Sequence, residues 1–65
     1  MKAERSKLNL AMARACMNPQ DLAIAAGMPA QTVNGVLRER SVRPATLGRI
    51  ARALGVDVTE IMKEE

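Results

Sequence analysis

The side chains best suited to binding chemistry in this sequence are the arginines in its middle third. Arg38, Arg40 and Arg43 lie close together, and Arg49 and Arg52 follow soon after. Guanidinium groups match phosphate oxygens by bidentate hydrogen bonds, so such a cluster is typical of an edge that binds anions. The same arginines could instead form a solvated surface, and charge alone leaves both interpretations open.

The positive charge is concentrated in the same part of the chain. Between Leu22 and Val56 there are five arginines and one acid, a balance of +4. From Asp57 to Glu65 there are four acids and one lysine, a balance of −3, so the total of +3 hides an asymmetry. We therefore expect an anionic partner to contact the middle of the chain.

Several residue types are missing, and their absence excludes whole functional classes. The 65 residues include no histidine, no aromatic residue and a single cysteine, Cys16. Zinc fingers, Ser-His-Asp or Cys-His catalysis and an internal disulfide framework need residues that are absent. Readers of single-stranded nucleic acid stack bases on aromatic rings, which this chain lacks. We expect no enzyme, no metal, no cofactor and no small-molecule ligand, with Cys16 a small buried hydrophobe in a reducing compartment.

The sequence gives little sign of a membrane or targeting segment. Its longest largely apolar run, Leu22 to Ala30, is far shorter than the ~20 residues that span a bilayer. The apolar stretch after the basic N-terminal residues is interrupted by Asn9 and Arg14, which is unlike a signal peptide. We expect a cytoplasmic protein with no membrane partner, and a single domain over residues 1–65.

Helical periodicity predicts that five helices position the arginines. The first should end near Cys16, because Asn18-Pro19 is a helix-start signature that opens the second helix. Gly27 should end that helix, and Pro29 should open the third after a very short turn. The expected buried positions recur at helical spacing: Leu8, Ala11, Met12, Ala15, Val33, Val36, Leu37, Leu47, Ile50, Ala51 and Leu54.

Two further segments complete this prediction. Asn34-Gly35 is also a strong hairpin signal, but its flanks have helical spacing, so a helix is favoured there. Pro44 closes the basic loop and opens a fourth helix, which Gly55 ends. Asp57 and Glu60 then form a capping-box-like pair, which predicts a short fifth helix.

The segment from the second to the third expected helix resembles a known motif. A small residue allows close helix packing, a glycine makes the turn, and two valines fill the space between the helices. The residues with this joint pattern are Leu22, Ala23, Gly27, Met28, Val33 and Val36. The pattern resembles the helix-turn-helix of the phage-repressor and Cro type, the XRE family. The stretch from Arg43-Pro44 to Gly55-Val56 is similar to that family's fourth helix and its exit.

The resemblance implies a fold and a function. It implies an all-α, five-helix, lambda-repressor-like domain whose helix-turn-helix unit spans about residues 18–38. The implied function is sequence-specific binding of double-stranded DNA by a small prokaryotic transcriptional regulator, repressor-like, with the third helix in the major groove. The alternative is a protein-interaction module of the same fold, such as an antitoxin-like partner that binds another protein through its first and fifth helices.

Carried over from the family, the base-reading positions fall on Ala30, Gln31, Asn34 and Gly35. Glutamine and asparagine can each make a bidentate pair with adenine, and Ala30 can offer a methyl group to thymine. The alternative is that the two amides are only solvated polar residues. Gly35 either allows close approach of the backbone to the groove or is a degraded contact, and the sequence does not decide between them.

The resemblance also indicates phosphate contacts. Relatives often place a glutamine where this chain has Pro19, so the flanking Asn18 and Gln20, at a helix N-terminus, are the candidates here. Behind the third helix, Arg38, Arg40 and Arg43 are expected to face phosphates.

The chain departs from the family pattern at two further places. Relatives often pair an Arg on the first helix with a Glu on the third, where this chain has Met12 and Leu37, an apolar replacement. Glu39 stands where a glycine often follows the third helix, which weakens the predicted cap. Its carboxylate would lie near phosphates unless an arginine neutralises it.

The expected assembly is a homodimer on DNA, with two copies on neighbouring half-sites. The candidate dimer surface consists of Val58, Ile61 and Met62. These residues could equally close the hydrophobic core, and the sequence leaves both interpretations open.

Overall fold

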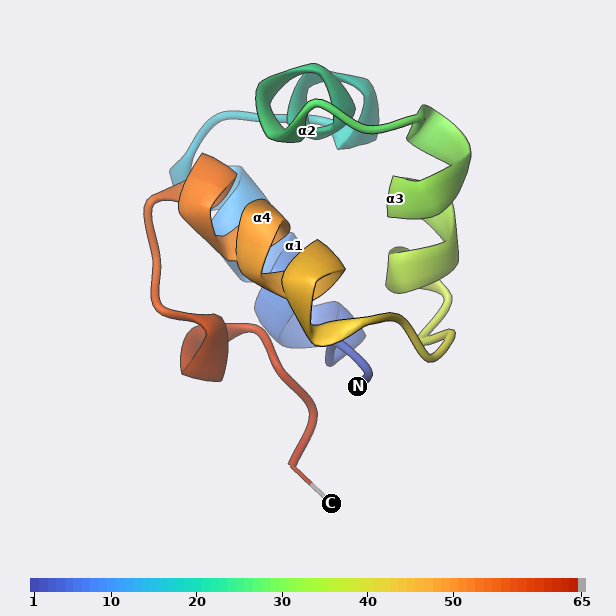
Figure 1. The fold of residues 1–65 in the computed structure, drawn as a ribbon. Helices are drawn as coiled ribbons and strands as arrows, with labels where there is room; N and C mark the ends of the chain where they lie inside the picture. Colours follow the sequence, from blue (N-terminus) through green and yellow to red (C-terminus); the bar gives the residue numbers. More distant parts are fainter. Residues whose placement is uncertain (65) are drawn as a thin grey trace.

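Four α-helices and one 3-10 turn form the fold in the computed structural model, which describes residues 1–64 (Figure 1). They are α1 (Arg5–Arg14), α2 (Pro19–Ala26), α3 (Ala30–Leu37), α4 (Pro44–Leu54) and the turn η1 (Val58–Glu60). The predicted all-α class is confirmed, and no strand occurs in the described part of the chain.

The predicted count of five helices is not confirmed, because the expected fifth helix is only a single 3-10 turn, η1. Its capping pair does form, since Asp57 N–H donates to Glu60 Oε2 at 3.2 Å and Thr59 N–H donates to Asp57 Oδ1 at 2.9 Å. The helix does not continue, because the chain after it pairs with the N-terminal segment. Glu4 N–H donates to Ile61 O at 2.9 Å and Lys63 N–H to Lys2 O at 2.8 Å.

Local signals in the sequence explain α2 and the turn that follows it. Asn18 Oδ1 accepts from Asp21 N–H at 2.8 Å, and Asn18 N–H donates to Asp21 Oδ2 at 3.2 Å, which completes a capping box. Pro19 occupies the first helical position, where its missing N–H costs nothing. Gly27 ends the helix at φ +66°, as predicted. Asn34-Gly35 lies inside α3, so the hairpin alternative is excluded.

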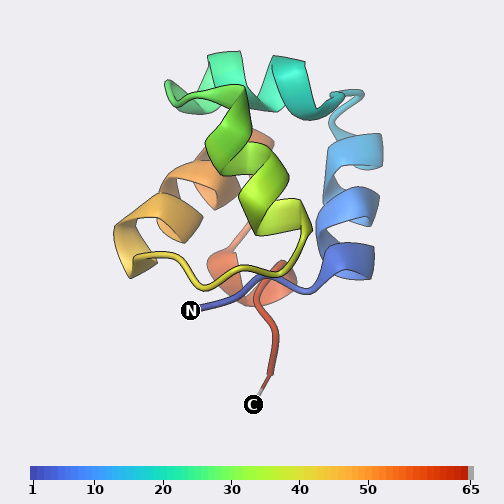
Figure 2. The same cartoon turned by 90° about the vertical axis from the view of Figure 1, so that its right-hand side faces the viewer.

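The hydrophobic core lies between the four helices, and α3 packs across one side of it (Figure 2). Val33 and Val36 of α3 have no exposed surface, as predicted, whereas Ala15 and Leu37 are only half-buried. The core residues are Ala3, Leu8, Ala11, Met12, Leu22, Ala23, Ala26, Val33, Val36, Leu47, Ile50, Ala51, Leu54 and Ile61.

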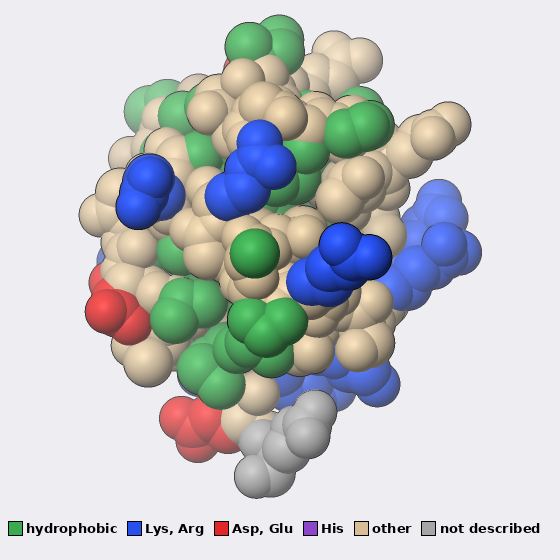
Figure 3. Space-filling model, viewed as in Figure 1, with side chains coloured by type: hydrophobic (Ala, Val, Ile, Leu, Met, Phe, Trp, Pro, Cys, Tyr) green, Lys and Arg blue, Asp and Glu red, His purple; other side chains and the backbone are tan. Residues whose placement is uncertain are grey.

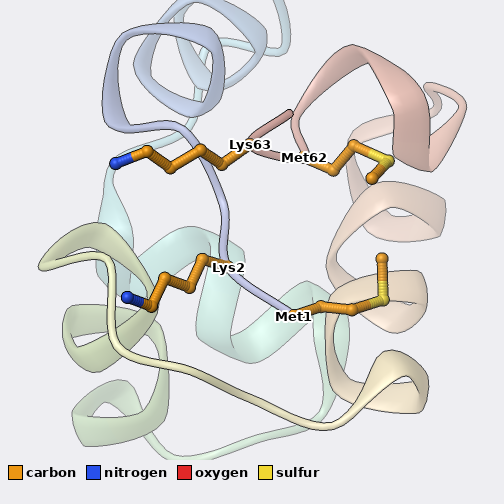
Figure 4. Close-up of a pocket in the computed structure, with 4 residues that line it drawn as sticks. All are labelled: Met1, Lys2, Met62 and Lys63. Atoms are coloured by element: carbon orange, nitrogen blue, oxygen red, sulfur yellow. The ribbon is translucent and has the colours of Figure 1, made fainter. Parts of the chain in front are cut away.

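The N-terminal segment is a part of the fold that helical periodicity did not predict. It pairs with the C-terminal segment through the antiparallel bridge between Ala3 and Met62, and Ala3 is completely buried. On its other side, Val42 N–H donates to Met1 O at 2.7 Å, which ties the loop between α3 and α4 to the segment. Figure 4 shows Lys2 and Lys63 pointing to one side of the paired segments, away from the methionines, around an open hollow.

Cys16 corrects another expectation, because its side chain is exposed and not buried. α1 ends at Arg14, and Cys16 adopts φ +57° in the turn that follows. Met17 N–H donates to Met12 O at 2.9 Å, which closes the helix end in a Schellman-type arrangement. The left-handed position carries the Cys16 side chain out of the helix face that packs on the core.

Candidate nucleic-acid interface

The outward face of α3 presents two amide side chains. Gln31 and Asn34 are both exposed and three residues apart, on the side opposite Val33 and Val36. Neither amide makes a side-chain hydrogen bond within residues 1–64, so their donors and acceptors are available to a ligand. Ala30 is half-buried and packs partly against the core.

Gly35, the fourth candidate base-reading position, lies beneath Arg40. A Cβ built at Gly35 would lie 3.6 Å from Arg40 Cδ, which is an ordinary van der Waals contact. Arg40 N–H also donates to Gly35 O at 3.0 Å. The aliphatic part of Arg40 therefore follows α3 beside Gly35, close to the face that carries the amides.

The candidate phosphate-binding arginines surround the end of α3. Arg38 is the C-cap of α3, Arg43 is the N-cap of α4, and Arg40 lies in the loop between them. All three are exposed, and their guanidinium groups make no hydrogen bond or ion pair with the described residues. In Figure 3, Lys and Arg groups line the right-hand margin, where α3 lies in Figure 1, and others lie over α4.

The N-terminus of α2 has a more restricted role than the sequence suggested. Asn18 is exposed, but its Oδ1 atom already accepts the N–H of Asp21, so only its amide nitrogen remains for a ligand. Gln20 is exposed and makes no side-chain hydrogen bond within the described chain. This end of α2 therefore offers the side-chain NH2 of Asn18, the side-chain amide of Gln20 and the backbone N–H of Gln20, because the other first N–H groups are absent or already bonded.

Arg49 clamps the turn between α2 and α3. Its Nη2 atom donates to Ala26 O and to Gly27 O, both at 3.0 Å. The last carbonyls of α2 are thus satisfied by a cation, which also suits the negative end of the helix dipole. The sequence placed Arg49 only among the arginines that could match phosphates, because no local pattern connects it with partners 22 and 23 positions away.

Glu39 has its own partners at the other end of α3. Its Oε1 accepts from Lys63 Nζ at 2.8 Å, and its Oε2 accepts from Arg5 N–H at 3.2 Å. Arg5 Nε in turn donates to Leu37 O at 3.2 Å. The hydrogen bond from Lys63, and next that from Arg5, lower the pKa of the Glu39 carboxyl below its ordinary value. The carboxylate is therefore hydrogen-bonded by a lysine and by the N-terminus of α1, and the charges of Lys63 and Arg5 also lower its pKa.

Comparison with protein families identifies this arrangement. Residues 7–65 match the Cro/C1-type HTH DNA-binding domain. The chain belongs to this family. No significant match exists among the curated proteins. None of the helices in residues 1–64 is long and apolar enough to cross a membrane.

Solved structures that share the Cro/C1-type fold include parts of two larger proteins. A mutant of hydroxyethylphosphonate dioxygenase superposes with a TM-score of 0.84 at 23% identity, over 98% of this chain and 14% of that one. A Streptomyces albus HEPD with 2-hydroxyethylphosphonate and Fe(II) bound superposes with a TM-score of 0.76 at 28% identity. That match covers 86% of this chain and 13% of the other. The chain therefore spans a small part of each of these proteins.

The departures of this Cro/C1-type chain from its family's pattern have structural explanations. Met12 is buried and Leu37 half-buried, so apolar side chains occupy the positions where relatives often carry an ion pair. Glu39 adopts the left-handed conformation, φ +61°, that a glycine would adopt at the same place. The cap of α3 therefore forms despite the glutamate.

The candidate dimer surface needs a correction. Ile61 has no exposed surface and belongs to the core, so it cannot contact a second copy in this fold. Val58 and Met62 are half-buried and pack against the same core. Of the two interpretations left open by the sequence, closure of the core is the one that applies to Ile61.

Proposed function

We propose that this Cro/C1-type domain binds specific sequences of double-stranded DNA with α3 in the major groove. The observation that carries the proposal is the division of α3 into two faces. Val33 and Val36 are completely buried, while Gln31 and Asn34 are exposed and unpaired within the described residues. The two amides read adenines through their N6 and N7 atoms, and Ala30 and Gly35 complete the contact surface.

Phosphate contacts hold the domain on the duplex. Arg38, Arg40 and Arg43 bind phosphates on one side of α3, and Asn18 and Gln20 at the start of α2 bind them on the other. These contacts supply affinity without sequence preference, whereas the amides of α3 supply the preference.

A homodimer on DNA is the assembly that suits a domain of this size. Its longest dimension is 28 Å, less than the ~34 Å between half-sites one helical turn apart. Two copies on such half-sites combine their contacts, so a weak interface on one copy becomes a stable complex. The biological role is then a small, repressor-like transcriptional regulator in the cytoplasm, where prokaryotic DNA lies.

Residues 1–65 carry out no catalysis in this proposal. The dioxygenase named among the similar structures has an activity of its own, and this chain matches only 14% of that protein. The present sequence has no histidine and a single cysteine, so it lacks the residue sets of histidine- and cysteine-based catalytic sites.

The test is selection of bound sequences from random duplex DNA. We expect a short motif containing adenines at the positions read by Gln31 and Asn34, repeated with two-fold symmetry. A single unrepeated half-site would contradict the homodimer and leave specific binding intact. Failure to recover any motif would contradict the proposed function.

Such a failure would favour the protein-interaction alternative. Among the described residues, the large apolar side chains most accessible to such a partner are Leu10 of α1, 53% exposed, and Ile24 of α2, 81% exposed. Substitution of either residue by serine would then disturb binding of a partner protein but not of DNA.

A further inference from the structure

Three charged residues outside the proposed DNA contacts hold the C-terminal end of α3. Glu39 accepts hydrogen bonds from Arg5 N–H and Lys63 Nζ, at 3.2 Å and 2.8 Å. Arg5 Nε donates to Leu37 O at 3.2 Å. The cluster joins the N-terminus of α1, the C-terminus of α3 and the C-terminal segment, which are far apart in sequence. We refer to Arg5, Glu39 and Lys63 as the α3 latch.

The backbone of Glu39 indicates that its side chain has a specific role. Its φ of +61° lies in the left-handed region, which is unfavourable for a residue with a Cβ. The Schellman arrangement requires this conformation: Glu39 N–H donates to Val36 O and Arg40 N–H to Gly35 O, both at 3.0 Å. Glycine would satisfy the same backbone with less strain. The two bonds of the carboxylate compensate for the strain that glutamate introduces.

The latch also satisfies two helix ends at once. Glu4, the N-cap of α1, makes no side-chain cap bond, and the carboxylate of Glu39 accepts the N–H of Arg5 instead. In the opposite direction, the Arg5 guanidinium donates to a carbonyl in the last turn of α3. An anion at the start of one helix and a cation at the end of another both agree with the helix dipoles.

We propose that the α3 latch positions the DNA-binding surface, an inference that rests on the proposed function. Glu39 lies between Arg38 and Arg40 in the chain, so fixing it fixes the backbone from which both arginines extend. The far end of the same loop is fixed by Val42, which exchanges two backbone hydrogen bonds with Met1 at 2.7 and 2.9 Å. The loop is therefore ordered before DNA arrives, which reduces the entropy lost on binding.

Removal of the Glu39 side chain distinguishes an electrostatic role from a positioning role. A carboxylate beside phosphate-binding arginines repels DNA, so deleting its charge would strengthen binding. A positioning role predicts weaker binding, because Arg38 and Arg40 lose their fixed backbone. The sign of the change therefore separates the two roles.

The experiment compares Glu39→Gly and Glu39→Asn with the wild-type protein. Glycine and asparagine both accept the left-handed conformation, so the cap of α3 is retained while the carboxylate and its two hydrogen bonds are lost. Glu64→Gln is the control, because it also removes one negative charge but its side chain makes no hydrogen bond or ion pair with residues 1–64. Circular dichroism first verifies that each variant is folded at the assay temperature.

We expect both Glu39 variants to bind the selected duplex about five- to tenfold more weakly, the scale of reordering one or two groups on binding. Glu64→Gln should change affinity by less than about twofold. Amide hydrogen exchange at Arg38 and Arg40 should accelerate in the Glu39 variants, while exchange in α4 stays as in the wild type.

Two outcomes would overturn the inference, and they are distinguishable. If the wild type binds a selected duplex and the Glu39 variants bind it equally well or better, the latch has no positioning role and the proposed function stands. If the wild type binds no selected duplex, the proposed function fails and this inference fails with it.

Discussion

Substitution of Arg49 tests how the helix-turn-helix is held together. Arg49→Ala removes both hydrogen bonds from Nη2 to Ala26 O and Gly27 O. A hydrogen bond to a charged group contributes about 1.5–3 kcal/mol, and a cation at a helix C-terminus about 0.3–1 kcal/mol. Because Arg49 is exposed, solvent screening reduces this contribution, and we expect a loss of about 1–2 kcal/mol. For a domain of this size the Tm should fall by about 4–16 °C.

Arg52→Ala is the matched control for this measurement. It removes the same charge from the same helix, but the Arg52 guanidinium makes no hydrogen bond or ion pair within the described residues. Both substitutions gain the same helix propensity, so the difference between them isolates the clamp. The chain has no tryptophan or tyrosine, so urea and thermal unfolding are followed by far-UV circular dichroism. If the two variants agree within about 0.5 kcal/mol, the clamp contributes nothing and the reasoning is refuted.

Gly27→Ala examines the same clamp from the other side. A Cβ at Gly27 would lie 3.2 Å from Arg49 Nη2, and the residue has φ +66°. The substitution therefore adds left-handed strain of about 1 kcal/mol and displaces the guanidinium. In the Arg49→Ala background only the strain remains, so the double variant should lose less stability than the sum of the single variants. Simple additivity would mean that the two groups do not interact.

The remaining predictions concern the recognition surface and the titration of the carboxylates. Gln31→Ala and Asn34→Ala should each reduce the binding free energy on the preferred duplex by about 1–3 kcal/mol and weaken the base preference at single positions. Binding is measured on a panel of single-base variants of the duplex, and an unchanged preference would refute base reading by these amides. Neutralising Arg38, Arg40 or Arg43 should weaken binding to all duplexes alike and lower the salt slope by about 1; an altered base preference with an intact slope would contradict the phosphate role. Gly35→Ala and Gly48→Ala should each stabilise the fold by about 0.5–1 kcal/mol, since an added Cβ meets only Arg40 Cδ at 3.6 Å or open space. If Gly35→Ala, but not Gly48→Ala, lowers the affinity for DNA, the backbone at Gly35 lies close to the groove. If the affinity of Gly35→Ala equals that of the wild type, Gly35 is a degraded contact. The pKa of Glu39 and that of Asp57 both lie below their ordinary values of 4.5 and 3.8. The stability that each carboxylate adds to the folded state is therefore fully present above its ordinary pKa, and it is lost as the pH falls through its lowered pKa. In Glu39→Gln and Asp57→Asn, the free energy of unfolding should fall less steeply with decreasing pH than in the wild type. An unchanged pH dependence in both variants would contradict this prediction.

The helix-turn-helix was predictable because its signals are local. Asn18 and Asp21 cap α2 three residues apart, and Gly27 ends the helix in the conformation that glycine accepts most easily. The burial of Val33 and Val36 follows from helical spacing on α3. Each of these predictions needs only a short window of sequence.

Long-range contacts explain most of what the sequence did not predict. Arg49 of α4 donates to carbonyls at the end of α2, and Glu39 accepts hydrogen bonds from α1 and from the C-terminal segment. Ala3 is buried because of a backbone bridge to Met62, which no periodicity indicates. The same bridge prevents a fifth helix, since the residues after η1 use their backbone groups to pair with residues 2–4.

Left-handed helix ends show a different limit of sequence reasoning. Glycine occupies this conformation at Gly27 and Gly55, and both ends were predicted. Cys16 and Glu39 occupy it as well, although residue type argues against it. At Glu39 the side-chain bonds offset the strain; for Cys16, within the described residues, the structure shows the backbone closure but no such side-chain bond.

The residues proposed to read bases differ from the residues that hold α3 in place, so base preference can change without a loss of stability. Gln31 and Asn34 are exposed and make no side-chain hydrogen bond within residues 1–64, so substitutions there should alter base preference with little effect on stability. Arg49 and Glu39 lie outside the proposed base-reading face: Arg49 holds the turn that precedes α3, and Glu39 holds the C-terminal end of α3. Changes at these two positions should alter stability or affinity on every duplex without changing which bases are preferred. The two groups of residues can therefore vary independently, and the panel of single-base variants measures whether they do.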